Sequence, residues 1–365
     1  MKSYSEFMEY IKENVTDYLP ERFEEAEISI QQVVKNNDVV LDGLSIRNPD
    51  SNISPNIYLN PLYEQYQKGR NLDELVSGIA DTYIENMEPI ENRTFQVQIE
   101  DIKNYEVVKG EIFPRLVNLE KNTTRLQNVP YMQREDLAIT YHVKVSGNRD
   151  SIGSLMITNE LMEVYGVTKE KLHTQAMENM ERLSPPVFLP LGEMIVDVMT
   201  EDFGRNEGVS QEEAKEYVKD MIPTGGPNVY CLTNQYKMNG AVGIMSESIQ
   251  QMVADRVGGD YYVLPSSVHE VLIVPQSAGM DPEELTDMVN TVNEGCVMQD
   301  EILSDHVYQY DAKEHKLSLC APAKEMKQEQ TMEQNRQPAF EEKSIDATKQ
   351  PEQSHEPIKH SGRSH

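Results

Sequence analysis

The sequence predicts an α+β protein with mixed, largely antiparallel sheets, flanking helices and a disordered C-terminal tail. Three observations support this prediction. Apolar, β-branched runs come in pairs across turn sequences, which is the pattern of antiparallel hairpins. Segments with helical apolar spacing and capping residues alternate with these pairs. After residue 322 the chain becomes polar and poor in apolar residues.

Residues 1–92 are predicted to form an N-terminal α/β unit. Ser3 and Glu6 make a capping box that opens a helix. Asn36-Asn37-Asp38 is a turn sequence that joins two strands into a hairpin. Asn60 is expected to cap a second helix and Asn71 a third. The expected strands are Ile28–Val34, Val39–Ile46 and Ile53–Leu59.

Residues 93–322 are predicted to form a larger α+β domain. Thr168 is expected to cap a helix in its first half. The other elements expected there are a helix at Val97–Asn104, an apolar stretch at Ile112–Leu119, a helical turn at Glu120–Leu126, and a hairpin of Leu137–Val145 and Ser151–Thr158. The glycine-containing stretch 201–227 is predicted to be an insertion, with a capped helix from Ser210 and the character of a loop or lid.

The second half of this domain has the most regular pattern. Gly258 is expected to end a helix that begins near Glu247. Asp281 is expected to cap another helix. The predicted buried stripe of that helix is Leu285, Met288, Val289 and Val292. The predicted strands are Val229–Thr233, Gly240–Met245, Val268–Val274, Val307–Tyr310 and Lys316–Leu319.

The chain is strongly acidic, with a formal net charge of −29 over 365 residues. Residues 323–365 carry seven basic and eight acidic side chains, so almost all of this charge belongs to the folded body. Nucleic-acid binding and attachment to anionic membranes both need clustered Lys and Arg, which this balance disfavours. The expected partners are a basic protein or a small neutral ligand. An acidic mimic that binds a basic partner is one alternative.

The compartment is predicted to be the cytoplasm. The three cysteines, Cys231, Cys296 and Cys320, are widely spaced and form no CxxC pair, which indicates a reducing environment. The N-terminus lacks an apolar signal core, and the sequence contains no apolar run long enough to span a membrane.

The densest chemical signal is a cluster between two apolar runs. Ser266, Ser267, His269 and Glu270 lie within five residues of each other and are the candidate ligand-binding residues. Ser267 and His269 are the candidates for catalysis in a hydrolase. A catalytic triad needs groups that converge from separate elements, and neighbours in a strand point to opposite faces. A strand at Val268–Val274 would therefore separate His269 from Glu270.

Other chemistry has little support in the sequence. The histidines show no HxH, HxxxH or HExxH spacing, so no metal site is predicted. No Walker lysine or GxGxxG pattern accompanies Gly225-Gly226 or Gly258-Gly259, so no cofactor is predicted either.

Several phrases together resemble one family. They are Val34–Asn37, Leu41–Arg47, Asn52–Leu59, Arg115–Asn118, Asn128–Pro130, Asp136–Ile139, Leu232–Asn234, Gly240–Ala241, Tyr262–Val271 and Leu303–Asp305. In this order they resemble the domain-of-unknown-function 5688 family of Firmicutes. The resemblance extends to about Leu319 and implies no activity. It implies a cytoplasmic bacterial protein, often encoded near mobile elements. The leading hypothesis is an uncharacterised, non-enzymatic binding or accessory protein, with the hydrolase as the enzymatic alternative.

Overall fold

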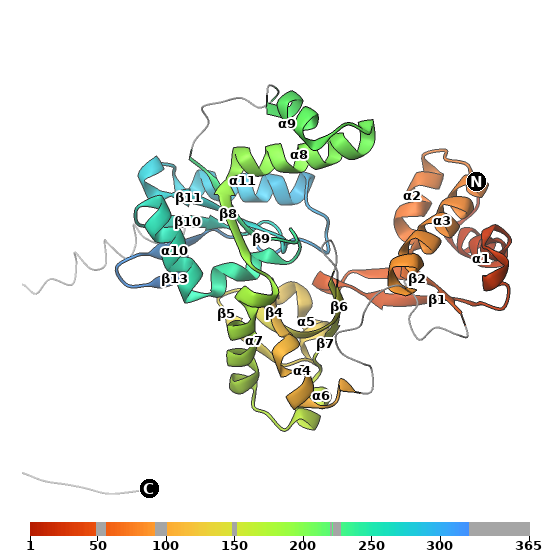
Figure 1. Cartoon of the computed structure of the whole chain (residues 1–365), viewed down its shortest axis with the longest axis horizontal. Coiled ribbons are helices and arrows are strands. Elements are labelled where there is room, and N and C mark those ends of the chain that lie inside the picture. Colours follow the sequence, from red (N-terminus) through yellow and green to blue (C-terminus); the bar gives the residue numbers. More distant parts are fainter. Residues whose placement is uncertain (49–55, 92–100, 148–151, 220, 222–227, 321–365) are drawn as a thin grey trace, which may run out of the picture. The chain divides into compact units, whose positions relative to one another are not determined.

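The computed structural model describes residues 1–48, 56–91, 101–147, 152–219, 221 and 228–320. Residues Met1–Cys320 form one compact unit. The strands of the described residues build three sheets in which every pairing is antiparallel (Figure 1). The predicted α+β class with largely antiparallel sheets is therefore confirmed. The tail predicted at 323–365 lies outside the described residues.

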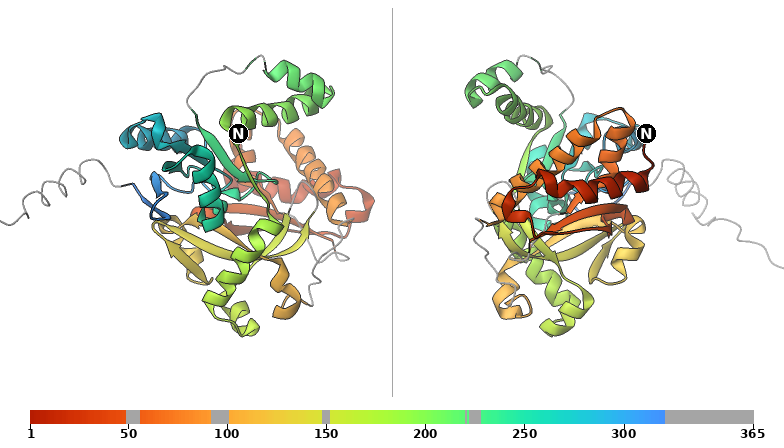
Figure 2. Two further views of the ribbon diagram at one scale, coloured as in Figure 1. Left: turned by 60° about the vertical axis from the view of Figure 1, so that its left-hand side comes forward. Right: turned by 90° about the vertical axis from the view of Figure 1, so that its right-hand side faces the viewer.

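The N-terminal sheet is a three-stranded meander with helices on one face (Figure 2). Its strands are β1 (Glu27–Val34), β2 (Val40–Arg47) and β3 (Asn56–Tyr58). Its helices are α1 (Tyr4–Asn14), α2 (Leu59–Gln67) and α3 (Leu72–Glu91), with short 3-10 turns at Val15–Tyr18 and Glu21–Phe23. Buried side chains from all three helices pack against Leu44 and Ile46 of β2. The predicted hairpin of β1 and β2 is confirmed.

The cap residues of this unit were predicted with mixed success. Ser3 and Glu6 form the expected capping box, and the Asn71 side chain accepts the backbone N–H of Asp73 at 2.8 Å. The prediction for Asn60 was wrong, because α2 begins one residue earlier, at Leu59. The Asn60 side chain instead accepts the backbone N–H of Asp42 at 2.8 Å, which ties α2 to β2.

The second sheet is centred on the long strand β6 (Leu137–Gly147). It pairs with β4 (Ile112–Asn118), β5 (Tyr131–Arg134) and β7 (Ile152–Met156). The accompanying helices are α4 (Tyr105–Val108), α5 (Thr123–Leu126), α6 (Asn159–Tyr165) and α7 (Lys169–Leu183). The Thr168 cap is confirmed. The helix predicted at Val97–Asn104 falls partly outside the described residues, and helix α4 starts only after Asn104, which caps it.

The third sheet has six strands in the order β13-β12-β10-β11-β9-β8. These are β8 (Pro186–Pro190), β9 (Tyr230–Asn234), β10 (Tyr261–Leu264), β11 (Val271–Pro275), β12 (Tyr308–Asp311) and β13 (Lys316–Leu319). Its helices are α8 (Leu191–Glu207), α9 (Gln211–Lys219), α10 (Glu247–Val257) and α11 (Pro282–Gly295). Among the described residues, no helix is long and apolar enough to cross a membrane.

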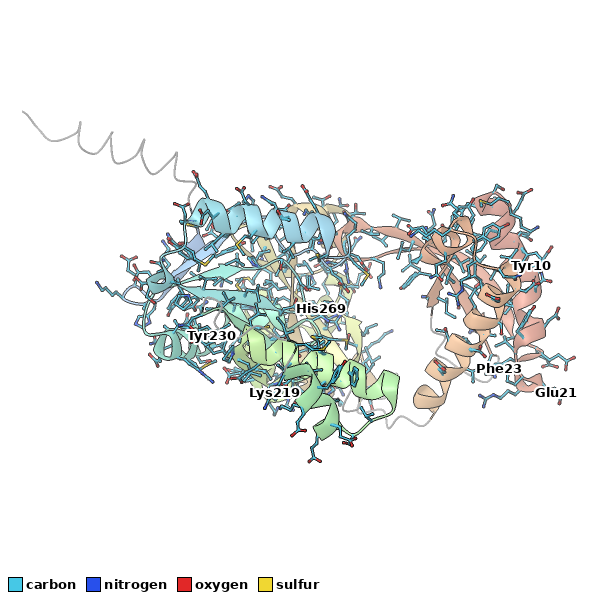
Figure 3. All side chains as sticks on the ribbon, turned by 90° about the horizontal axis from the view of Figure 1, so that it is seen from above. Tyr10, Glu21, Phe23, Lys219, Tyr230 and His269 are labelled. Carbon is cyan, nitrogen blue, oxygen red and sulfur yellow. The ribbon has the colours of Figure 1, made fainter. Side chains whose placement is uncertain are left out.

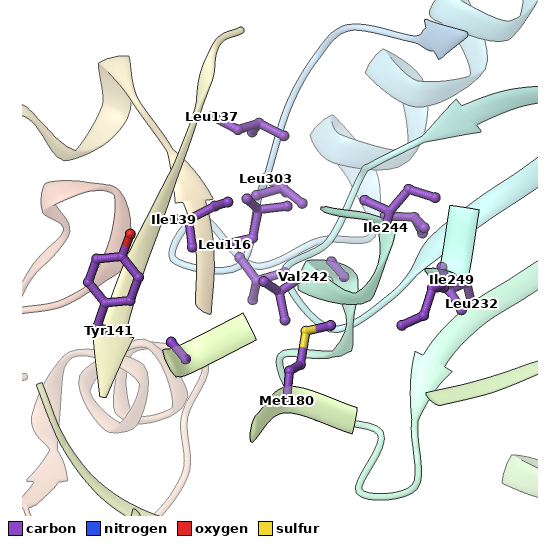
Figure 4. Packing of buried hydrophobic residues seen from close by; sticks show 14 of the residues in the cluster. Leu116, Leu137, Ile139, Tyr141, Met180, Leu232, Val242, Ile244, Ile249 and Leu303 are labelled. Atoms are coloured by element: carbon purple, nitrogen blue, oxygen red, sulfur yellow. The ribbon is translucent and has the colours of Figure 1, made fainter. Parts of the chain in front are cut away.

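Strand alternation places two cores on opposite faces of this sheet. Tyr261 and Val263 point into the largest core, which also receives side chains from β4, β6, α7 and α10 (Figure 4). Leu264 points the other way, where Leu285 and Val289 of α11 cover it. The large core therefore lies between the second and third sheets.

The predicted stripe of α11 was half wrong. Leu285 and Val289 are buried, but Met288 and Val292 are 50% and 40% exposed. The buried line continues to Asn293, because its side-chain amide donates to the backbone oxygen of Ser304 and to Asp305. The buried face of α11 therefore contains the polar residue Asn293, whereas the apolar spacing predicted Met288 and Val292 there.

Two predicted strands were wrong, and both errors concern the same region. Gly240–Met245 is a 3-10 helix, because Asn239 has a positive φ of 52° and the N–H groups of Gly240 and Ala241 bond to the oxygens of His269 and Val268. Val268–Val274 is a strand only from Val271.

The stretch 201–227 contains the end of α8 and all of α9, with Ser210 bonded to Glu213 as in a capping box. Residues 220 and 222–227 lie outside the described residues.

Candidate functional site

The predicted Ser/His/Glu cluster lies in the loop between β10 and β11. The Ser267 hydroxyl accepts the backbone N–H of His269 at 3.0 Å, which folds the loop into a turn. The loop is bonded along its length to the segment before β12. Val268 donates to the backbone oxygen of Glu301 at 2.9 Å, and Leu303 donates to that of Ser266 at 3.1 Å.

Both ring nitrogens of His269, the residue labelled in Figure 3, have a polar partner. Nδ1 accepts the backbone N–H of Asn239 at 3.2 Å. Nε2 lies 3.1 Å from a carboxylate oxygen of Glu301. Because Nδ1 accepts a hydrogen bond, the hydrogen-bond pattern assigns the ring proton to Nε2, which then donates to Glu301. The imidazole is therefore neutral in this arrangement.

The loop conformation changes the geometry that was expected of the candidates. His269 and Glu270 precede the strand, so strand alternation does not separate them, and that premise was wrong. Burial raises the pKa of Glu270, and the neighbouring His269 and a hydrogen bond from Ser267 oppose this shift. Of the four candidates, only His269 lines the cavity described next.

A cavity of about 280 Å³ lies beside His269. Its walls come from the β1–β2 hairpin tip, from β4, α5 and β6, and from the loops that hold His269 and Glu301. The lining residues are Val34, Lys35, Asn36, Arg115, Val117, Arg125, His142, Asn239, Val268, His269, Asp300 and Glu301.

The second sheet supplies the basic wall. Arg115 and Val117 share the face of β4 that points away from the main core, since Leu116 belongs to that core. An Arg115 side-chain nitrogen donates to the Ser154 hydroxyl at 2.8 Å. His142 of β6 lies on the same face, and its Nε2 is 3.3 Å from the Thr140 hydroxyl.

The hairpin tip docks against α5 and places Arg125. Asp38 accepts the backbone N–H of Thr124 at 2.8 Å and that of Arg125 at 3.3 Å. A residue from the hairpin tip of the N-terminal sheet therefore caps helix α5, which accompanies the second sheet. Burial raises the pKa of Asp38, but these hydrogen bonds outweigh it and hold that pKa below its usual value. Asn37, with a positive φ of 59°, donates to the backbone oxygens of Gln299 and Ile302.

The charge of the basic wall is only partly offset, because burial lowers the pKa of Arg125 and the charge of Asp38 opposes that shift. Burial, and then the charge of Arg125, lower the pKa of Arg115 to about 10, so it stays protonated at neutral pH. Burial and the two arginines lower the pKa of His142 well below its usual value, so it is neutral. Within the described ranges, neither Arg115 nor Arg125 forms an ion pair with a carboxylate.

Sequence reasoning missed most of this site. Arg115 is the one charged side chain in the apolar stretch Ile112–Leu119, and this interruption was the available signal. Lys35, Arg125 and Glu301 give no comparable signal, because each lies in a polar stretch. Among the residues that the structure describes, no group of three His, Cys, Asp or Glu side chains is arranged to hold a metal.

The fold and the cavity define a class: an α+β protein with antiparallel sheets and a polar, cation-lined cavity. The chain belongs to a family of unknown function, DUF5688, which matches residues 4–312. The predicted family is therefore confirmed. A comparison with curated proteins found no match. A comparison with solved structures found none either.

Proposed function

We propose that this protein is a non-enzymatic binding protein whose cavity holds a small anionic ligand. The observation that carries the proposal is Arg115, a half-buried cation beside a second cation, Arg125. Its Nε is buried without a hydrogen-bond partner, and it forms no ion pair with an acid among the described residues. An uncompensated buried charge costs several kcal/mol. An anion in the cavity offsets that cost. The cationic lining favours an anion over the neutral ligand suggested by the sequence.

The size of the cavity limits the ligand. Its volume of about 280 Å³ is at the lower end of the roughly 300–1,000 Å³ that is common for small-molecule sites. This supports a compact metabolite with a phosphate, sulfate or carboxylate group.

The hydrolase alternative has less support from the geometry. A serine nucleophile needs a base within about 3.2 Å. The Ser267 hydroxyl accepts from the backbone of His269, while the ring nitrogens of His269 face Asn239 and Glu301. Neither Ser266 nor Ser267 lines the cavity.

The remaining predictions stay proposals. Cytoplasmic location is supported by Cys231, Cys296 and Cys320, which are all free thiols. A bacterial origin and a link to mobile elements rest on the resemblance alone. The acidic mimic rests on the net charge of −29, and no described contact favours it over ligand binding.

Calorimetric titration in low-salt buffer tests the proposal with inorganic phosphate, sulfate, acetate and succinate as probes. We expect saturable binding of at least one probe, weakened roughly tenfold or more in Arg115→Gln, because a lost charged hydrogen bond costs about 1.5–3 kcal/mol. Arg134→Gln is the matched control, since Arg134 is an exposed arginine of the same sheet that does not line the cavity.

Equal weakening in both arginine variants would show non-specific attraction and contradict the proposal. Absence of binding by every probe would also contradict it. Circular dichroism of each variant separates a loss of binding from a loss of fold.

A further inference from the structure

The charged residues that line the cavity form a basic end and an acidic end. Arg115 and Arg125 of the basic end come from β4 and α5, whereas the Lys35 ammonium lies over the Tyr58 ring, 3.3 Å from its hydroxyl oxygen. Asp300 and Glu301 come from the segment before β12. The two ends do not neutralise each other, because no ion pair joins them in the part of the chain that the structure describes.

The basic end is a local group of cations. The charge that acts on the Arg115 guanidinium is that of Arg125, and both arginines act on His142. No carboxylate contributes to the lowered pKa of Arg115. Among the described residues, no carboxylate lies within ion-pair distance of this guanidinium.

The acidic end keeps its negative charge. Among the described residues, the Glu301 carboxylate has one contact at ion-pair distance, the His269 ring, and the Nδ1 of that ring accepts the Asn239 N–H. A neutral donor bonds a carboxylate without cancelling its charge. Asp300 is half-buried, and its backbone oxygen accepts from the Asn36 side chain at 2.9 Å. Its carboxylate has no ion pair among the described residues.

We propose that the ligand of this cavity is a small zwitterion. Its phosphate or carboxylate group lies at the Arg115–Arg125 end, and its ammonium group lies at the Asp300–Glu301 end. A simple anion would bind the arginines at the basic end, but the carboxylates at the acidic end would repel it. This inference rests on the proposed anion-binding function and narrows it to one chemical class, the amino acids and amino-phosphates.

Two matched pairs of probes test the inference by calorimetry in low salt. The first pair is 2-aminoethyl phosphate and ethyl phosphate, and the second is 4-aminobutyrate and butyrate. We expect the aminated member of at least one pair to bind about tenfold more tightly, the scale of one charge-assisted hydrogen bond. The pair that responds identifies the anionic group as phosphate or carboxylate.

Charge removal at the acidic end sharpens the test. Glu301→Gln keeps the shape and an oxygen acceptor for His269 Nε2, so it should abolish the preference for the aminated probe and leave ethyl phosphate or butyrate bound. Asp300→Asn, which keeps the backbone bond to Asn36, is the second variant and should reduce the preference. Glu270→Gln is the control, because this carboxyl lies in the same loop as His269 but does not line the cavity.

The outcomes distinguish the two proposals. Equal binding within both pairs would overturn the zwitterion and leave the anion-binding function standing. A preference that survives in both Glu301→Gln and Asp300→Asn would also overturn it. If no member of either pair binds, and the simple anions fail as well, the proposed function falls and the inference falls with it.

Discussion

At the scale of single residues, burial decides the chemistry more than residue type does. Ser267 looks like a nucleophile in the sequence, but its hydroxyl serves a turn. Arg115 looks like an ordinary strand residue, but it is a half-buried cation with a pKa lowered to about 10. Glu270 is half-buried and has a raised pKa. These environments arise only when distant segments meet around each side chain.

Glu270→Gln tests the environment of this carboxyl. Because burial raises its pKa, the folded state holds the proton more tightly than the unfolded state, whose pKa is about 4.3. Stability from this group is thus present at low pH and lost as pH rises through the folded pKa. We expect the variant to be more stable than the wild type at pH 7 by about 1 kcal/mol, and equal to it near pH 4.

Urea denaturation at the two pH values measures this difference. Glu294→Gln, at an exposed position of α11, is the control and should change stability little at either pH. A Glu270→Gln variant that is less stable than the wild type at pH 7 would show that the carboxylate makes a stabilising contact and does not destabilise the folded state.

At the scale of elements, one close backbone approach positions the site. The chain reverses at Asn239 and then runs against β9 and the His269 loop, where Gly240 donates to the His269 oxygen at 2.9 Å. A Cβ at Gly240 would lie 2.5 Å from the Thr233 hydroxyl oxygen, 2.6 Å from the Asn234 nitrogen and 2.8 Å from the His269 oxygen. Only glycine permits this packing.

Gly240→Ala should therefore disturb both fold and site. Two of the three close atoms belong to backbone, so the neighbouring chains must move, at a cost of roughly 1–3 kcal/mol. Movement at this point also displaces the Asn239 N–H from His269 Nδ1. Thermal unfolding measures the loss of stability, and the nitrogen chemical shifts of the His269 ring report the tautomer.

Gly243→Ala is the matched control in the same 3-10 helix. The nearest atom to its added Cβ would be a methyl carbon of Ile249 at 3.7 Å, an ordinary contact. We expect a change within about 0.5 kcal/mol there. Equal losses at the two glycines would contradict the close-approach explanation.

At the scale of the whole molecule, the hairpin tip joins two separate cores. In the described part of the chain, the buried residues of the core around Phe7 and Leu44 end at Tyr83, whereas those of the main core begin with Tyr105. Contacts of Asn36, Asn37 and Asp38 connect the two parts. Val34, Lys35 and Asn36 of the same hairpin line the cavity. We therefore expect ligand binding in the cavity and docking of the hairpin tip to be linked.

Asp38→Ala tests this connection. The Asp38 pKa is held below its usual value, so the stability it contributes is present above the unfolded pKa of about 3.9 and is lost as pH falls through the folded pKa. We expect a loss of about 1 kcal/mol at pH 7, as for other helix caps, and a smaller loss at pH 3. Faster hydrogen exchange at the Thr124 and Arg125 amides should accompany it.

The exposed Asp17 provides the control for this prediction, since Asp17→Ala removes an acid without removing a cap bond. If hydrogen exchange at Thr124 is unchanged in Asp38→Ala, the tip does not hold α5 and the proposed linkage fails.

The sequence by itself determined the local structure of this protein. Caps such as Ser3, Thr168 and Asp281, the helix stop at Gly258, and the β1–β2, β6–β7 and β12–β13 hairpins depend on neighbouring residues, and these were predicted correctly. Strand alternation and helix capping act over a few residues, so they can be read along the chain.

Only the tertiary structure decided the site. Lys35, Arg115, Arg125, His269 and Glu301 are spread over 267 positions and meet because three sheets and a hairpin tip pack together. The 3-10 helix after Asn239 replaced a predicted strand, because bonds to the His269 loop outweighed the local preference. Protonation states, tautomers and cations without an ion pair depend on distances between residues that are far apart in the sequence. These distances are set only when the chain is folded.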